Sequence, residues 1–266
     1  MRNKSIEKIV ERLDASRDFT IFFVGDSITE GARSTCPDRT YVAIFANLLA
    51  KRCKGRRVVR FDGKRHPTED GELLPLLTYG EPISVQDVAD GTITVVRSGI
   101  GGNTVRRMLN RKGDFICREV GGREADLFII NVGINDALFK DKSKYVPFEV
   151  FGSDLGRLID EIESHMPKAD IILVTPSYHD HGVTSESHLD PYADEMKRVA
   201  LERSIPVIDL HDAWMRHLVV GGENYGQGNW LSGVSGDCCH PGDEGHKAIA
   251  EILEREMFRS AQCEMK

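Results

Sequence analysis

The sequence predicts an α/β fold, a three-layer α/β/α sandwich around a five-stranded parallel sheet. Short apolar, β-branched runs alternate along the chain with segments of helical periodicity. The runs are apolar on both faces, as expected for parallel strands that helices cover on both sides. Repeated β-α-β units with right-handed crossovers then give three layers. The five runs are Phe19–Val24, Ile93–Arg97, Leu127–Val132, Ile171–Thr175 and Pro206–Leu210.

The helical segments lie before, between and after these runs. In the N-terminal segment, at about residues 4–16, apolar residues recur at i, i+3, i+4 and i+7 with charges between them, which predicts an amphipathic packing helix. A last helix is predicted after Pro241-Gly242, with Asp243 as its N-cap. The other predicted helices are Tyr41–Lys51, Thr104–Leu109, Phe148–His165 and Tyr192–Arg203.

Two segments depart from this alternation. Residues at about 61–92 interrupt the crossover between the first two strands and carry three Asp-Gly turn signals, so we expect an insertion there. Residues 214–236 contain six glycines, which predicts a long loop before the last histidine block. Neither a repeat nor a linker is visible, so residues 1–266 are expected to form a single domain.

Composition narrows the function classes. The 266 residues carry a net charge of −7, which argues against a nucleic-acid partner because such binding needs a basic face. The one basic cluster, within residues 51–60, follows a helical segment, where cations offset the negative end of the helix. With no signal peptide and no apolar run of about 20 residues, we expect a cytoplasmic protein without membrane contact. Its six cysteines are too scattered for a disulfide framework.

Ser27 is a candidate nucleophile. It lies on a Gly-Asp-Ser turn just beyond the first predicted strand. A serine hydroxyl needs a nearby base, and donors for the oxyanion that it creates. The alternative is a serine that caps a helix or a turn. The Gly-x-Ser-x-Gly pattern of α/β-hydrolases is missing, because Thr29 stands at the second glycine position.

Oxyanion donors can come from two further strand ends. Asn135 follows the strand Leu127–Val132, and its side-chain amide can donate to an oxyanion, although a turn asparagine remains the alternative. The glycines of residues 98–104 expose backbone amides after the second strand. This segment is not a dinucleotide fingerprint, since Thr104 stands where the third glycine belongs.

Asp237 and His240 form a candidate acid/base pair before the last helix. Their spacing of three lets the carboxylate hold one ring nitrogen of the imidazole, which leaves the other nitrogen to take the serine proton. Rival imidazoles are His246 and the cluster of His179, His181 and His188. We expect no metal site at that cluster or at Cys238-Cys239, because neither shows the ligand spacing of one.

Together these blocks resemble the SGNH (GDSL-like) hydrolase/esterase family. Gly25-Asp26-Ser27, Gly102 before Asn103-Thr104, Gly133-x-Asn135-Asp136 and Asp237-x-x-His240-Pro241 match four of its blocks in order. The resemblance implies Ser27 as nucleophile, His240 as base and Asp237 as its partner. It also implies an oxyanion hole of the Ser27 and Gly102 amides with Asn135. Gly101 is an alternative to Gly102 in the second block.

The resemblance agrees with the predicted fold. In a flavodoxin-like strand order 2-1-3-4-5, the crevice lies between strands one and three, which Ser27 and Asn135 follow. The family implies a serine esterase that cleaves a small-molecule carboxylic ester through an acyl-enzyme on Ser27, without metal or cofactor. Family breadth suggests a short acyl group and a carbohydrate alcohol. An acyltransferase, a thioesterase or lysophospholipase, and a binding protein that retains the fold remain alternatives.

Overall fold

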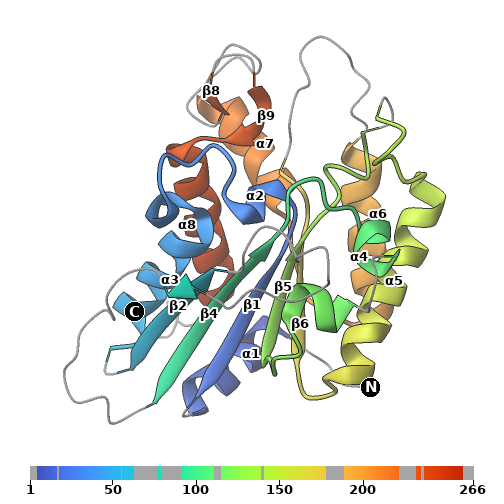
Figure 1. Cartoon of the computed structure of the whole chain (residues 1–266). Coiled ribbons are helices and arrows are strands. Elements are labelled where there is room, and N and C mark those ends of the chain that lie inside the picture. Colours follow the sequence, from blue (N-terminus) through green and yellow to red (C-terminus); the bar gives the residue numbers. More distant parts are fainter. Residues whose placement is uncertain are drawn as a thin grey trace.

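A computed structural model describes residues 5–16, 18–54, 56–62, 77–78, 91–110, 115–138, 141–177, 189–221, 232–234 and 237–259. The main sheet has seven strands in the order β3-β2-β4-β1-β5-β6-β7 (Figure 1). All neighbouring strands are parallel except β3, which is antiparallel to β2. The strands are β1 (Phe19–Gly25), β2 (Arg57–Asp62), β3 (Leu77–Thr78), β4 (Thr92–Gly99), β5 (Leu127–Asn131), β6 (Asp170–Val174) and β7 (Val207–Ile208).

The predicted fold class is confirmed, and the predicted strand count is too low. The five predicted strands are β4, β1, β5, β6 and β7, side by side in the predicted order. The sequence analysis missed β2, which pairs in parallel with β4. The sequence analysis assigned Arg57 and Arg60 to the basic cluster after a helix. On the side away from β4, this strand borders only the two-residue β3, and Arg57 is exposed. The Arg60 side chain is mostly covered and forms an ion pair with Asp38 at 2.6 Å.

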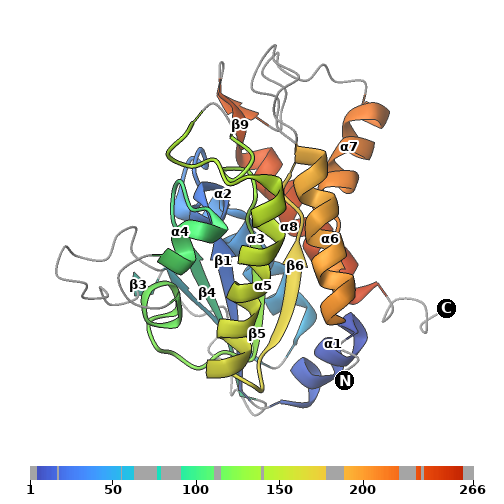
Figure 2. The ribbon, with the colours of Figure 1, turned by 90° about the vertical axis from the view of Figure 1, so that its right-hand side faces the viewer.

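Helices cover both faces of the sheet (Figures 1 and 2). On one face, α3 packs against α8, and α1 also contacts α8. On the other face, α5 packs between α4 and α6. The helices are α1 (Ile6–Ala15), α3 (Tyr41–Arg52), α4 (Val105–Asn110), α5 (Phe148–His165), α6 (Leu189–Arg203) and α8 (Asp243–Phe258).

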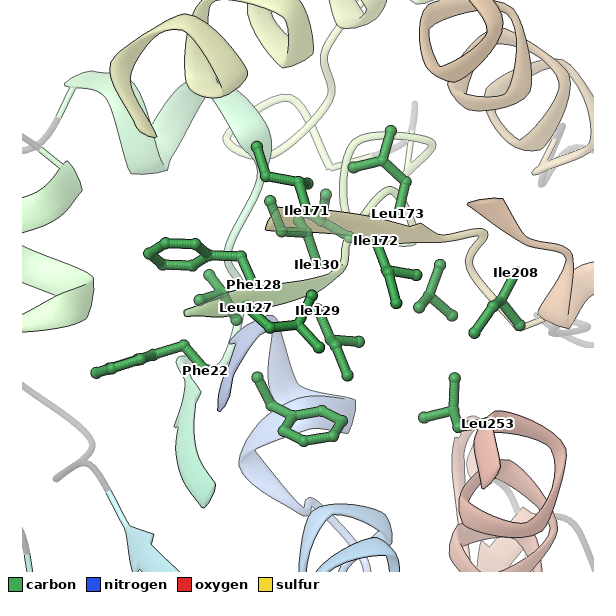
Figure 3. Close-up of a cluster of buried hydrophobic side chains, with 14 of the residues drawn as sticks. Phe22, Leu127, Phe128, Ile129, Ile130, Ile171, Ile172, Leu173, Ile208 and Leu253 are labelled. Atoms are coloured by element: carbon green, nitrogen blue, oxygen red, sulfur yellow. The ribbon is translucent and has the colours of Figure 1, made fainter. Parts of the chain in front are cut away.

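The core lies on both sides of the central strands (Figure 3). Every residue of β5 and β6 is buried, including the polar Asn131 and Asp170 at their ends, as expected for parallel strands that helices cover on both faces. Phe22 of β1 packs against Phe128 of β5 with ring centroids 5.8 Å apart, and Leu253 of α8 contributes from the helix layer. Burial of this much apolar surface makes the sheet a rigid base for the loops at its carboxyl edge.

The segment predicted as a long loop over residues 214–236 is partly regular. It begins within α7 (Leu210–Gly221), a helix with Leu210 and Trp214 buried one turn apart. It ends in β8 (Ser232–Val234), which pairs antiparallel with β9 (Asp237–Pro241). The loop prediction was therefore wrong at both ends of the segment. Residues 222–231, and most of the predicted insertion at 61–92, lie outside the described residues.

The predicted N-cap of the last helix is also wrong by one position. Gly242 is the N-cap of α8, and Asp243 lies in its first turn. The Asp243 carboxylate accepts hydrogen bonds from Thr35 and Arg39, which connects the start of α8 to the loop after the first strand. Among the described helices, none is both long and apolar enough to cross a membrane.

Candidate active site

The turn after β1 places Ser27 at the carboxyl edge of the sheet. Gly25 ends the strand at a position where only glycine fits, because a Cβ there would lie 2.2 Å from Thr29 Oγ1. Asp26 is the N-cap of α2 (Ser27–Glu30), and its Oδ1 accepts a hydrogen bond of 2.9 Å from the Ile28 amide. Ser27 is thus the first residue of a capped helical turn, with its hydroxyl partly exposed.

Ser27 and His240 are in contact although 213 positions separate them. The Ser27 hydroxyl lies 2.8 Å from His240 Nε2, within hydrogen-bond distance. The strand β9 carries the histidine to α2, above the end of β1 (Figure 1). Asp237 begins the same strand, but its side chain lies outside the described part of the structure.

His246 is fully buried and has a structural role. Its Nδ1 accepts a hydrogen bond from the Tyr41 amide at 3.3 Å, and its Nε2 lies 3.1 Å from the Ala32 carbonyl, to which it donates. Burial lowers the pKa of this histidine to about 4, against a smaller opposing effect of the Ala32 hydrogen bond. This imidazole is therefore neutral at pH 7, and both ring nitrogens are occupied.

The end of β5 and the end of β4 are joined by side-chain amides. Asn135 Nδ2 donates to the Asn103 carbonyl at 3.0 Å. Asn103 is itself completely buried, and its Nδ2 donates to the Gly25 carbonyl at 3.0 Å. The three strand ends that carry the predicted site residues are thus held in one hydrogen-bonded network. One hydrogen of the Asn135 amide remains for another acceptor, since an amide NH₂ has two.

Gly102 lies in a tight turn from Ile100 to Asn103. The Asn103 amide donates to the Ile100 carbonyl at 3.1 Å, and the φ of Gly102 is +75°, as the third residue of a type II turn requires. Within the described residues, the backbone amides of Gly102 and Ser27 donate to no protein acceptor. Two unused donors therefore lie on the loops that follow β4 and β1.

Two buried carboxyl groups lie beneath these loops. Burial raises the pKa of Asp26 to about 6, although the Ile28 amide and the nearby His240 favour its charged form. Burial also raises the pKa of Asp136 well above its usual range. Asp136 Oδ1 accepts from the Val105 amide at 3.0 Å, while its buried Oδ2 has no hydrogen-bond partner among the residues that the structure describes. Asp136 therefore anchors the start of α4 through the Val105 amide.

Charged side chains flank the turn at Gly101 and Gly102. A Cβ on Gly101 would lie 2.8 Å from a Glu30 carboxylate oxygen and 4.0 Å from the Ser27 Cβ. A Cβ on Gly102 would lie 3.3 Å from an Arg107 guanidinium nitrogen and 3.5 Å from Lys144 Cε. An acidic group thus lies on the Ser27 side of the turn, and two basic groups lie on the other side.

The structure brings four of the five predicted site residues to one edge of the sheet: Ser27, Gly102, Asn135 and His240. The rival histidines 179, 181 and 188 lie outside the described residues. In the part of the chain that the structure describes, no three potential metal ligands cluster together. The sequence analysis did not single out Asn103 or Asp136, whose only signals were their places beside Gly102 and Asn135.

Comparison with known proteins identifies the family. Residues 78–248 match the model of the GDSL-like Lipase/Acylhydrolase family. The chain belongs to this family, which makes it an SGNH-type carboxylic ester hydrolase, as the sequence predicted. The matched region contains Gly102, Asn135, Asp237 and His240, while Ser27 precedes it. No curated protein matches the sequence.

Solved structures share the fold. The acetylxylan esterase Axe2 from Geobacillus stearothermophilus is 24% identical, with a TM-score of 0.60 over 90% of this chain and 94% of that one. The acetyl xylan esterase AlAXEase is 18% identical, with a TM-score of 0.63 over 90% and 99%. The α/β hydrolase LAE5, from the metagenome of Lake Arreo in Spain, is 21% identical, with a TM-score of 0.61 over 90% and 94%.

Proposed function

We propose that the protein is a serine esterase in which Ser27 is the nucleophile and His240 its general base. The observation that carries the proposal is the 2.8 Å contact between Ser27 Oγ and His240 Nε2. A neutral imidazole at this distance can take the hydroxyl proton as the oxygen attacks a carbonyl carbon. Asp237, three residues before His240, is proposed to hold the other ring nitrogen and to stabilise the imidazolium.

The oxyanion hole is proposed to consist of the Ser27 and Gly102 amides and the side chain of Asn135. Both amides lack a protein acceptor among the described residues, and Asn135 retains one free N–H after its bond to Asn103. Donors that are already oriented stabilise the negative charge of the tetrahedral intermediate without reorganisation. The buried network beneath them supplies that orientation.

The reaction has two stages. In the first, Ser27 adds to the ester carbonyl, His240 takes the serine proton and returns it to the leaving alcohol, and an acyl-serine forms. In the second, His240 takes a proton from water, which attacks the acyl-serine, and the proton then returns to Ser27 as the acid leaves. No step requires a group that the chain itself does not provide.

We further propose an acetyl group on a carbohydrate as the substrate class. Two of the structural neighbours are described as acetylxylan esterases. Structures of Axe2 include catalytic mutants of a serine, an aspartate and a histidine, of which the last two are three positions apart. Asp237 and His240 have the same spacing.

A substrate panel with an active-site probe tests this proposal. The panel contains acetylated xylooligosaccharides, aryl esters of graded acyl length, a thioester and a lysophospholipid. We expect the highest kcat/KM for acetyl esters, and a fluorophosphonate mass shift that maps to Ser27. Turnover that rises with acyl length would overturn the acetyl assignment. Failure of the probe to label the protein, together with no turnover, would overturn the esterase proposal itself.

A further inference from the structure

Arg107 occupies a defined place beside the turn at Gly102. Its Nη1 donates to the Gly102 carbonyl at 3.0 Å, and its Nη2 donates to the Ser143 carbonyl at 2.9 Å and to the Ser143 hydroxyl at 3.3 Å. The guanidinium therefore bridges the loop after β4 and the loop before α5. Because its acceptors, Gly102 and Ser143, lie on two different segments, the guanidinium is held more firmly in place than that of an ordinary surface arginine.

No carboxylate in the described part of the chain balances the charge of Arg107. All three of its hydrogen bonds go to neutral acceptors, and within the described residues it forms no ion pair. The adjacent Arg106 differs, because its Nε lies 2.9 Å from the buried Asp154 carboxylate. A guanidinium has five N–H donors, so Arg107 keeps donors for a further acceptor. An arginine fork is the side chain best suited to a planar carboxylate.

Lys144 adds a second cation at the same place. Its Cε would lie 3.5 Å from a Cβ on Gly102, and its ammonium forms an ion pair of 3.2 Å with Asp141. Asp141 also accepts hydrogen bonds from Ser143, and these bonds lower the pKa of its carboxyl together with Lys144. We refer to Arg107 and Lys144 as the cationic rim. Among the described residues, Arg107, Lys144 and Asp141 together carry one positive charge that no ion pair compensates, in a chain whose net charge is −7.

We propose that the cationic rim binds a carboxylate that the substrate carries next to the scissile ester, so that the enzyme prefers anionic esters to neutral ones. The inference rests on the proposed function, because it takes the Gly102 amide as an oxyanion donor. The rim lies on the Gly102 side of the turn and Glu30 lies on the Ser27 side, so the two charges would orient such a substrate in one direction. An acidic sugar ester is one chemical class with this feature.

The test compares two aryl acetates of the same shape, 4-acetoxybenzoate and 4-acetoxybenzamide, which differ in charge. The measured quantity is the ratio of the two kcat/KM values, acetoxybenzoate over acetoxybenzamide. The different chemical reactivities of the two esters affect this ratio equally in the wild type and in each variant, so they cancel when the ratios are compared. We expect Arg107→Gln to lower the ratio by about tenfold, the loss typical of one charge-assisted hydrogen bond. Arg107→Lys should retain part of the preference. A monophenyl fumarate and fumaramate pair repeats the comparison with the carboxylate on the acyl side.

The matched control is Arg123→Gln, which removes an exposed arginine just before β5, at the opposite end of the sheet. It should leave the ratio unchanged. Raising the salt concentration should lower the wild-type ratio and leave that of Arg107→Gln nearly constant, because salt screens partly exposed charges. If Arg107→Gln keeps the wild-type ratio for both substrate pairs, or Arg123→Gln lowers it equally, the proposal is wrong.

A binding measurement tests the cationic rim independently of whether the protein is an esterase. Ser27→Ala is titrated by calorimetry with 4-hydroxybenzoate and with 4-hydroxybenzamide, with and without the Arg107→Gln change. We expect tighter binding of the carboxylate, and loss of that difference in the double variant. Such a result supports the rim even if no ester is turned over. Equal binding of the two compounds to Ser27→Ala overturns the rim even if the enzyme is an active esterase.

Discussion

The side chain of Asn135 reaches across from the end of β5 to the backbone of Asn103, donating a hydrogen bond of 3.0 Å to its carbonyl. The same Asn103 donates from its side chain to Gly25, the last residue of β1. One buried residue thus connects the loop that contains Gly102 to the strand that precedes Ser27. The position of the proposed oxyanion donors therefore depends on a network beneath them as well as on the loops themselves.

Replacement of the Asn135 side chain tests its proposed role. Asn135→Ala removes one oxyanion donor and should lower kcat by roughly 10²–10³, the loss measured for such donors in other enzymes. KM should change less, because the donor acts mainly on charge that develops in the transition state. Steady-state kinetics on an aryl acetate measure both. A rise in KM with kcat unchanged would make Asn135 a ground-state binding residue instead.

Loss of the Ser27 hydroxyl should abolish ester hydrolysis without unfolding the protein. The side chain is partly exposed, and the helical turn that carries it is capped by Asp26, so Ser27→Ala removes no core contact. We expect no fluorophosphonate adduct and a melting temperature close to that of the wild type. Ser153→Ala, an exposed serine on α5, is the matched control and should react normally. Residual labelling of Ser27→Ala at another serine would identify a different nucleophile.

The sequence predicted the fold class because most residues of its five central strands are apolar, at positions that face both sides of the sheet. It missed β2 because Arg57 and Arg60 interrupt the apolar pattern in a strand next to the sheet edge. It missed α7 because the glycines after residue 220 dominate the composition of the whole segment. The helical spacing of Leu210 and Trp214, which are buried one turn apart in α7, was therefore overlooked.

Site residues were predictable where a motif marks them. Ser27 and His240 stand in short blocks, and the structure brings their side chains into contact. The network beneath them was not predictable in the same way, since Asn103 and Asp136 are ordinary polar residues next to motif positions. Their burial and their partners from other strands are properties of the folded chain alone.

Asp26 should make the folded protein less stable as the pH rises from 4 to 6. Burial raises its pKa to about 6 from the ordinary aspartate value of 3.8, so the folded state binds the proton more tightly than the unfolded state does. The stabilisation from this group is present below pH 4 and is lost as the pH rises through 6. At 1.36 kcal/mol per pKa unit, the loss is on the order of 3 kcal/mol.

Asp26→Asn keeps an oxygen that can accept from the Ile28 amide but removes the titration. Relative to the wild type, this variant should therefore gain stability between pH 4 and pH 7. Urea unfolding at each pH measures the difference, in which the titration of the other groups cancels. A constant difference across this range would show that Asp26 does not titrate there.

Replacement of His240 should abolish turnover, whereas replacement of His246 should leave it nearly unchanged. His240→Ala should lose nearly all turnover, because no other described imidazole contacts Ser27. Asp237→Ala should leave more residual activity, since its proposed role is to orient and stabilise rather than to carry the proton. His246→Gln should retain most of the wild-type kcat, because His246 is buried and occupied by Tyr41 and Ala32.

His246 should affect the stability of the folded protein. The direction in which this effect changes with pH follows from the lowered pKa of the imidazole. The pKa of about 4 in the folded state lies below the ordinary histidine pKa of 6.5, so the unfolded state binds more protons at intermediate pH. The buried neutral histidine therefore causes no loss of stability above pH 6.5. The free energy of unfolding decreases as the pH falls from 6.5 toward 4. Over that range the loss attributable to this group is on the order of 3 kcal/mol.

The comparison that checks this assignment is the unfolding free energy of wild type and His246→Gln at pH 4, 5, 6 and 7. His246→Gln should be less stable than the wild type at pH 7, and the gap should narrow toward pH 4 because only the wild type carries the titrating imidazole. His165→Gln, an exposed histidine at the end of α5, is the control for removal of an imidazole without removal of a buried contact. If His246→Gln abolished turnover while His240→Ala retained it, the general base would be His246 and the proposed mechanism would be wrong.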